Sequence, residues 1–179
     1  MAVRKGQFRI RSNMSKSNQS KKHTMIEDIH VSINKILLAI DKSGYKNKAT
    51  AYAINLAKAL GAEVTVVHII GRSSFGATGD LLGYYRGGKL KAYQEALKKE
   101  AEKLLRGAVE LGQKEGVTMH SEVIMDSSAE KAIIDYAKKQ KMDLIIIGTK
   151  GMTGIERFLM GSVANDVITY AHCPVLAIR

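Results

Sequence analysis

The sequence has almost no cysteine and no long apolar run. Its single cysteine, Cys173, cannot form a disulfide within the chain, which argues against a disulfide-built secreted domain. No apolar stretch approaches the about 20 residues that a helix needs to cross a bilayer. The basic N-terminus is not followed by the apolar segment of a signal peptide. We therefore expect a cytoplasmic protein that does not insert into a membrane.

Two common nucleotide-binding motifs are also missing. Residues 71–78 imitate the spacing of a Walker A loop, but Ala77 stands where the phosphate-binding lysine should be. No G-x-G-x-x-G sequence follows the first expected strand, so the dinucleotide-binding fingerprint is absent. Any nucleotide site in this chain must be built differently.

The chain is basic, but its charge is unevenly distributed. Its 179 residues are 45% hydrophobic and 25% charged, which is typical of a soluble globular domain. Of the net charge of +11, residues 1–32 carry +5, and the remaining +6 is spread over mixed stretches such as residues 98–103. A solvated surface explains this pattern as well as a nucleic-acid footprint would, so we do not expect nucleic acid as a partner.

The chain divides into an extension and one folded domain. Residues 1–32 are rich in Ser, Asn and Lys and have no sustained hydrophobic period, which predicts a flexible basic N-terminal extension. Met14 and Met25 are alternative starts, which leaves open whether all of this extension belongs to the natural protein. Residues 33–179 form the expected domain.

Short apolar strands alternate with amphipathic helices in this domain, in the order βαβαβαβαβ. Such an order predicts an α/β fold with a parallel sheet covered by helices on both faces, which binds ligands beyond the carboxyl ends of its strands. A long Gly/Ser-rich loop is expected at 71–88. The expected strands are 36–40, 64–70, 117–125, 144–147 and 175–178, and the expected helices are 48–60, 90–112, one that starts near Ser128, and 162–170.

A glycine-rich stretch follows the fourth expected strand. Residues 148–162 read GTKGMTGIERFLMGS and connect the apolar run 144–147 to a helix that begins at Ser162. The free N–H groups and the positive dipole of a helix start attract phosphate, and glycines let a ligand approach the backbone closely. The stretch therefore predicts an anion site, to which Lys150 would add a charge and Ser162 a hydroxyl.

Local chemistry also permits plainer interpretations. Gly148, Gly151 and Gly161 would then serve only turns, and Ser162 would only cap its own helix. Asp41, which ends the first expected strand, would likewise accept hydrogen bonds from the following turn instead of contacting a ligand.

The histidines do not suggest a metal site. His68 lies within an apolar strand, where a hydrogen-bonded core histidine is the expected structure. The other four are too scattered for a metal-ligand spacing; they are His23, His30, His120 and His172. We expect no metal ion held by protein side chains alone.

The glycine spacing resembles a known signature. Gly148-x2-Gly151-x9-Gly161-Ser162 is similar to the G-x2-G-x9-G-[S/T] motif of the ATP-binding branch of the universal stress protein family. The resemblance covers about residues 33–179, with Ala39 standing where some relatives have proline. Four further segments resemble the family's strands at the same places in the chain: 36–41, 66–69, 143–148 and 173–178.

The resemblance implies a Rossmann-like open five-stranded sheet of order 3-2-1-4-5 that binds ATP. It also implies a homodimer formed through the last strand, 175–178. Ala39 and Asp41 would line the nucleoside pocket, with Ile69 and Ile147 as its apolar walls. The residues expected around the phosphates are Gly148, Lys150, Gly151, Gly161, Ser162 and Val163.

These features favour an ATP-binding sensor or switch in a stress response. Hydrolysis needs a base or a group that positions water, and the only candidate is Asp41, which the resemblance places at the nucleoside end. Any ATPase activity is therefore expected to be weak, with Mg²⁺ or Mn²⁺ as the candidate divalent ion.

Two alternatives belong to other functional classes. One is a nucleotide-independent dimeric interaction module in which the glycines are structural and the basic extension binds an acidic partner. The other is an ATP pyrophosphatase of a wider related superfamily. The second is disfavoured, because residues 41–44 contain one glycine and lack the SGGxDS order of that phosphate loop.

Overall fold

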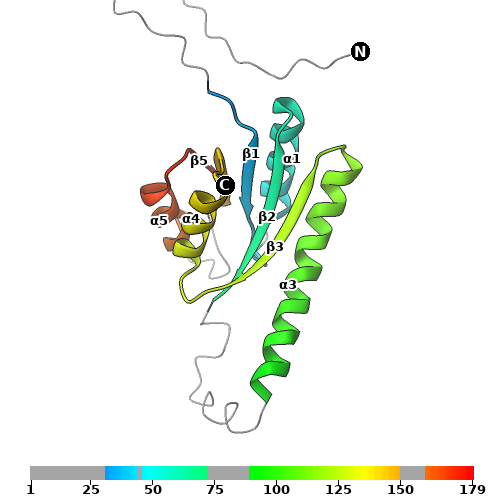
Figure 1. Ribbon diagram of the computed structural model, residues 1–179, viewed down its shortest axis with the longest axis vertical. Helices are drawn as coiled ribbons and strands as arrows, with labels where there is room; N and C mark the ends of the chain where they lie inside the picture. Colours follow the sequence, from blue (N-terminus) through cyan, green and yellow to red (C-terminus); the bar gives the residue numbers. More distant parts are fainter. Residues whose placement is uncertain (1–30, 44–45, 72–88, 150–159) are drawn as a thin grey trace, which may run out of the picture.

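The computed structural model describes residues 31–43, 46–71, 89–149 and 160–179. Within these ranges strands and helices alternate along the chain, as Figure 1 shows. The strands are β1 Lys35–Ala39, β2 Glu63–Ile70, β3 Met119–Met125, β4 Leu144–Gly148 and β5 Val175–Ile178. The helices are α1 Lys46–Leu60, α3 Lys89–Lys114, α4 Ala129–Gln140 and α5 Ser162–Tyr170.

The five strands form one parallel sheet in the order β3-β2-β1-β4-β5, which confirms the predicted topology. Strand β1 lies at its centre, with Ala39 paired to Val67 of β2 on one side and to Ile147 of β4 on the other. The carboxyl ends of these three strands therefore lie side by side at one end of the sheet. Strand order reverses there, because the chain moves outward from β1 first to β2 and β3 and later to β4 and β5.

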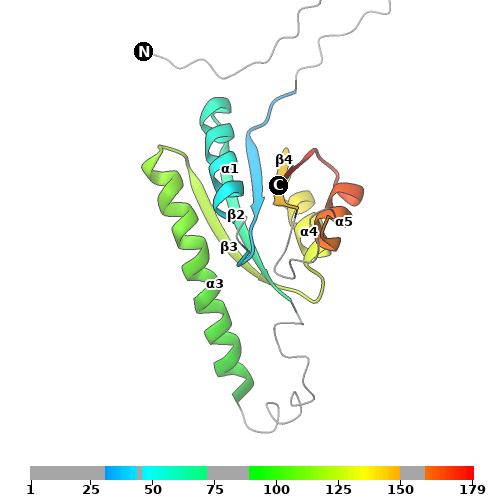
Figure 2. The same cartoon turned by 180° about the vertical axis from the view of Figure 1, so that it is seen from behind.

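Helices cover both faces of the sheet (Figures 1 and 2). Helices α1 and α3 pack on one face, over a core that includes Ile36, Leu38 and Val64. Helices α4 and α5 pack on the other, over a core that includes Leu37 and Ile145. Burial on both faces explains why β1 and β4 are continuous apolar runs in the sequence.

The outer strand β3 is more exposed than the central strands. Its middle residues, from His120 to Glu122, are exposed, whereas Met119 at its start is buried. Charged and polar side chains on an edge strand discourage pairing with a second sheet. The opposite edge, β5, carries no charged residue between Val175 and Ile178. None of the described helices is long and apolar enough to cross a membrane.

Candidate functional site

A cavity of about 530 Å³ lies at the carboxyl ends of the strands. Eight of the ten residues predicted for the nucleotide site line it, although they come from four separate parts of the chain. The other two, Lys150 and Gly151, lie outside the described residues. The eight are Ala39, Asp41, Ile69, Ile147, Gly148, Gly161, Ser162 and Val163.

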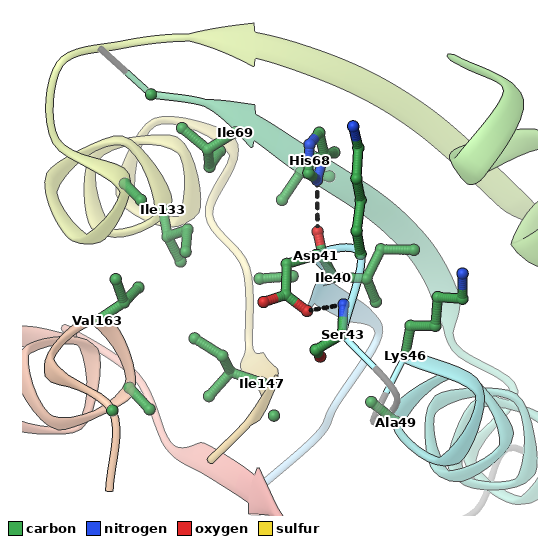
Figure 3. A pocket seen from close by; sticks show the side chains of 18 of the residues that line it. Ile40, Asp41, Ser43, Lys46, Ala49, His68, Ile69, Ile133, Ile147 and Val163 are labelled. Atoms are coloured by element: carbon green, nitrogen blue, oxygen red, sulfur yellow. Dashed lines mark hydrogen bonds between the residues drawn. The ribbon is translucent and has the colours of Figure 1, made fainter. Parts of the chain in front are cut away.

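Asp41 occupies the end of the central strand. Its Oδ1 atom accepts a hydrogen bond from the backbone N–H of Ser43 at 2.9 Å, so the turn-forming role considered for this residue is present. Among the described residues no hydrogen-bond donor pairs with its Oδ2 atom. In Figure 3 the carboxylate points toward the space bounded by Ile147, Val163 and Ile133. One oxygen thus holds the turn, and the other can accept a hydrogen bond from a ligand.

His68 holds β2 to the end of β1. It is buried, and its Nδ1 atom lies 2.8 Å from the carbonyl oxygen of Ile40 (Figure 3). Because a carbonyl oxygen can only accept, Nδ1 carries the proton of this hydrogen bond. The structure therefore confirms His68 as a hydrogen-bonded core residue, whose bond fixes the backbone immediately before Asp41.

The apolar part of the cavity is larger than the sequence indicated. Besides Ile69 and Ile147, it includes Leu97 from α3 and Ile133 from α4. Both residues belong to the periodic apolar faces of their helices, which signalled core packing and not a ligand. Ile133 lies near the start of α4, and Leu97 lies in the first half of α3.

The start of α5 has no side-chain cap. Its N-cap residue is Gly161, with φ −61° and ψ 148°, and no side chain accepts a hydrogen bond there. Ser162 is the first helical residue, so the plainer interpretation of Ser162 as an N-cap is wrong. The first hydrogen bond of the helix runs from the N–H of Asn165 to the carbonyl oxygen of Gly161, so the N–H groups of Ser162, Val163 and Ala164 have no partner within the helix. No acidic residue occupies the first turn, so no carboxylate of the helix itself neutralises its positive end.

The start of α4, which also contributes Ala129 to the cavity wall, is built differently. Ser128 is its N-cap and accepts a hydrogen bond from the N–H of Lys131 at 3.1 Å, which confirms the helix start expected near Ser128. The Ser128 hydroxyl donates to Glu130 at 2.6 Å and lowers the pKa of that carboxyl. The backbone N–H of Ser128 donates to Asp126 at 3.1 Å and lowers its pKa. Two carboxylates therefore already occupy the positive end of α4.

Thr149 is a cavity residue that the sequence did not single out. Its backbone connects two elements, because its N–H donates to Ile178 at 2.8 Å and its carbonyl accepts from the N–H of Gly161 at 2.8 Å. Its side-chain oxygen is buried without a hydrogen-bond partner, alone among the buried side-chain polar atoms of the described residues. The position between Gly148 and Lys150 in the predicted loop was the available signal.

Comparison with known proteins identifies the family. The model of the universal stress protein family matches residues 32–179. A universal stress protein of Methanocaldococcus jannaschii is 37% identical over 145 residues, which cover 81% of each chain. The chain belongs to the universal stress protein family.

Solved structures share the fold of this universal stress protein. UspA from Lactobacillus plantarum superposes with a TM-score of 0.69 at 23% identity, covering 83% of this chain and 99% of the other. A universal stress protein from Archaeoglobus fulgidus, solved in complex with dAMP, has a TM-score of 0.57 at 26% identity. That match covers 83% of this chain and 99% of the other.

Two cationic side chains also line the cavity in this universal stress protein. Lys42 lies in the turn that follows β1, and Lys46 is the first residue of α1. Lys42 forms an ion pair with Glu100 of α3 at 2.8 Å, and its hydrogen bond lowers the pKa of that carboxyl. Within the described ranges, no group of three or more His, Cys, Asp or Glu residues is arranged to hold a metal ion.

Proposed function

We propose that this universal stress protein binds ATP in the cavity and acts as a nucleotide-dependent sensor or switch in a stress response. The observation that carries the proposal is the uncapped, acid-free start of α5 at one part of a cavity that also presents Asp41 and an apolar wall. An anionic group, a hydroxyl-bearing sugar and an apolar base each find a matching surface there. The dAMP complex of the Archaeoglobus relative supports an adenine nucleotide as the ligand class.

The cavity suggests how such a ligand lies. The free oxygen of Asp41 would accept hydrogen bonds from ribose hydroxyls, and the base would pack between Ile69 and Ile147. The phosphates would receive the N–H groups at Ser162 and Val163. Lys150 and Gly151 remain predicted phosphate contacts.

Hydrolysis is proposed to be weak. Asp41 is the single carboxylate among the described residues that line the cavity, and its Oδ1 already accepts the N–H of Ser43. In-line attack by water needs a base or a positioning group beside the terminal phosphate, which an aspartate at the nucleoside end does not supply. Mg²⁺ or Mn²⁺ would be held largely by the nucleotide's own phosphates and by water. We accordingly assign the protein a sensing role in the cytoplasm and not one of turnover.

The partner that we propose is a second copy of the chain, paired through β5. This strand forms an edge of the sheet, and its residues Val175, Leu176 and Ala177 are only half-buried. Ile168 and Tyr170 on the neighbouring α5 are 42% and 69% exposed. An apolar edge strand flanked by exposed apolar side chains favours strand-to-strand pairing. Sedimentation equilibrium is expected to give twice the mass of the chain.

Calorimetric titration with ATP tests the nucleotide proposal. The test variant carries Gly161→Val and Ser162→Ala, which narrow the backbone approach and remove one hydroxyl. Because the φ of Gly161 is −61°, valine fits this backbone without strain. We expect the variant to bind ATP at least about tenfold more weakly than the wild type. Equal binding by both proteins, or none by either, would favour a nucleotide-independent dimeric interaction module.

A further inference from the structure

A second hollow of about 490 Å³ lies between α1 and α3. We call it the α1/α3 groove; α1 contributes Lys46, Asn47 and Thr50 to it, and α3 contributes residues between Glu100 and Leu111. It shares three residues with the nucleotide cavity, Ile40, Lys42 and Lys46. The proposed nucleotide site makes no use of the α3 side of this groove.

The floor of the α1/α3 groove is apolar and open. Ile40 and Ala108 are buried at its base, Leu104 is half-buried, and Leu111 is 50% exposed at its edge. Gly107 leaves room above this floor, because a Cβ atom built on it meets nothing within 4 Å. The α1/α3 groove therefore has space for the side chains of a second molecule.

The walls of the groove carry unbalanced positive charge. Lys42, Lys46 and Lys103 line it together with one acid, Glu100, which is paired with Lys42 at 2.8 Å. Among the residues that the structure describes, no carboxylate lies within 4.0 Å of the amine of Lys46 or of Lys103. Figure 3 shows the Lys46 amine pointing away from the Asp41 carboxylate. Lys46 belongs to α1 and Lys103 to α3, so each of the two helices that form the groove contributes one of these lysines.

We propose that the α1/α3 groove docks an acidic peptide segment of a partner protein whose apolar side chains recur at helical spacing. Carboxylates of such a segment would meet Lys46 and Lys103, while its apolar face would cover Leu104 and Leu111. The chain's own N-terminal extension is a poor occupant, because residues 1–32 carry a net charge of +5. Charge complementarity therefore selects a partner of the opposite sign.

Docking is coupled to the nucleotide cavity, a step that rests on the proposed function. Lys42 and Lys46 line both hollows, so their positive charges act on a nucleotide bound in one hollow and on an acidic peptide bound in the other. Two anions that share counter-charges weaken each other, and by linkage each reduces the affinity of the other by the same factor. ATP thus releases the partner, and its loss permits docking.

Fluorescence anisotropy with the full-length protein tests the docking surface. The probe is a labelled 16-residue peptide of Glu and Leu, with Leu at positions i, i+3, i+4 and i+7; a scrambled peptide of the same composition is the control. Lys103→Glu is expected to weaken binding about tenfold by charge reversal at the groove. Lys98→Glu, on the same helix but lining neither hollow, should change it less than about twofold. Gly107→Gln should also weaken peptide binding, because the glutamine side chain fills the groove without straining α3.

The docking surface would be refuted if Lys103→Glu and Lys98→Glu reduced the peptide affinity equally, or if the scrambled peptide bound as tightly as the designed one. It would also be refuted if an RNA oligonucleotide or anionic vesicles bound more tightly than the peptide. Saturating ATP should lower peptide affinity at least about fivefold, within the usual range of coupling between sites. Peptide binding that ATP leaves unchanged would refute the coupling alone. A separate ATP titration without peptide reports on the proposed nucleotide site, so the two proposals can fail independently.

Discussion

The starts of α4 and α5 both line the cavity at the carboxyl ends of the strands, yet among the described residues only the start of α4 is capped by a side chain and paired with acids. At α4, Ser128 caps the helix, and the carboxylates of Asp126 and Glu130 occupy its positive end. At α5, Gly161 offers no side-chain acceptor, and the first turn contains no acid. A helix start is therefore not a phosphate site merely because of its direction; it becomes one when the sequence leaves its N–H groups unused.

The largest expected effect comes from placing an acid at the free helix start. Ser162→Glu adds a negative charge beside the proposed phosphates and should lower ATP affinity by about two orders of magnitude through like-charge repulsion. The stability of α5 should stay constant or rise, because an acid in the first turn is favourable. Calorimetric titration measures the first effect and thermal unfolding the second.

Ser127→Glu is the matched control at α4. It adds the same charge at an exposed position that does not line the cavity. ATP affinity should then change by less than about threefold. A comparable loss in both variants would mean that net charge, and not the α5 start, determines binding.

The next effect falls on stability and not on binding. Ser128→Ala removes the hydroxyl that accepts the N–H of Lys131 and donates to Glu130. The loss of this cap should lower the free energy of unfolding by about 0.5–2 kcal/mol. Urea denaturation measures the change, and ATP affinity should remain that of the wild type. Weakened ATP binding at unchanged stability would assign Ser128 to the nucleotide site.

Acid should distinguish the two helix starts further. The pKa values of Asp126 and Glu130 lie below their usual values of 3.8 and 4.5 because both carboxylates accept hydrogen bonds from Ser128. A carboxyl group whose pKa is lower in the folded than in the unfolded protein stabilises the fold. This stabilisation is complete at a pH above the pKa of the unfolded chain, and it is lost as the pH falls through the pKa of the folded protein.

Wild-type stability should therefore decline as the pH falls below about 4.5, and part of this decline should be missing in Ser128→Ala. Urea denaturation of both proteins between pH 7 and 3 measures the difference. The missing part belongs to Glu130, because alanine keeps the backbone N–H that donates to Asp126. Parallel pH profiles would show that the Ser128 hydroxyl does not lower the pKa of Glu130.

The smallest expected effect makes α5 resemble α4. Gly161→Ser supplies a side-chain acceptor at an N-cap whose backbone conformation serine adopts readily. Stability should rise by a few tenths of a kcal/mol, while ATP affinity falls because the new hydroxyl competes for the helix N–H groups. Tighter ATP binding would indicate that residue 161 contacts phosphate through a side chain.

Much of the fold could be predicted because its strands are buried on both faces. β1 and β4 appear in the sequence as apolar runs, and α5 begins at Ser162 as its position after the glycines indicated. The ends of helices and strands that depend on tertiary contacts could be predicted less precisely. The sequence ends the long helix at Gly112, but α3 continues to Lys114, and Gly116 adopts the left-handed conformation with φ +75°. Val117 is buried before β3 begins at Met119.

Site residues that stand at the end of a strand or at the start of a helix could be predicted from the sequence. Asp41 and Gly161 lie at strand and helix ends that the sequence marks. Leu97, Ile133 and Thr149 were missed, because their place in the cavity depends on how the helices and the β4 end meet in space. The choice between a cap and a free hydroxyl at Ser162 also needed the structure, since it depends on which residue begins the helix.

A comparison of ATP with adenosine tests most directly whether the start of α5 recognises phosphate, as we propose. Calorimetry would give both affinities for the wild type and for the variant with Gly161→Val and Ser162→Ala. ATP should bind the wild type at least about tenfold more tightly than adenosine, and the variant should reduce this preference while binding adenosine unchanged. The same ATP-to-adenosine ratio in both proteins would contradict the assignment of α5 to phosphate.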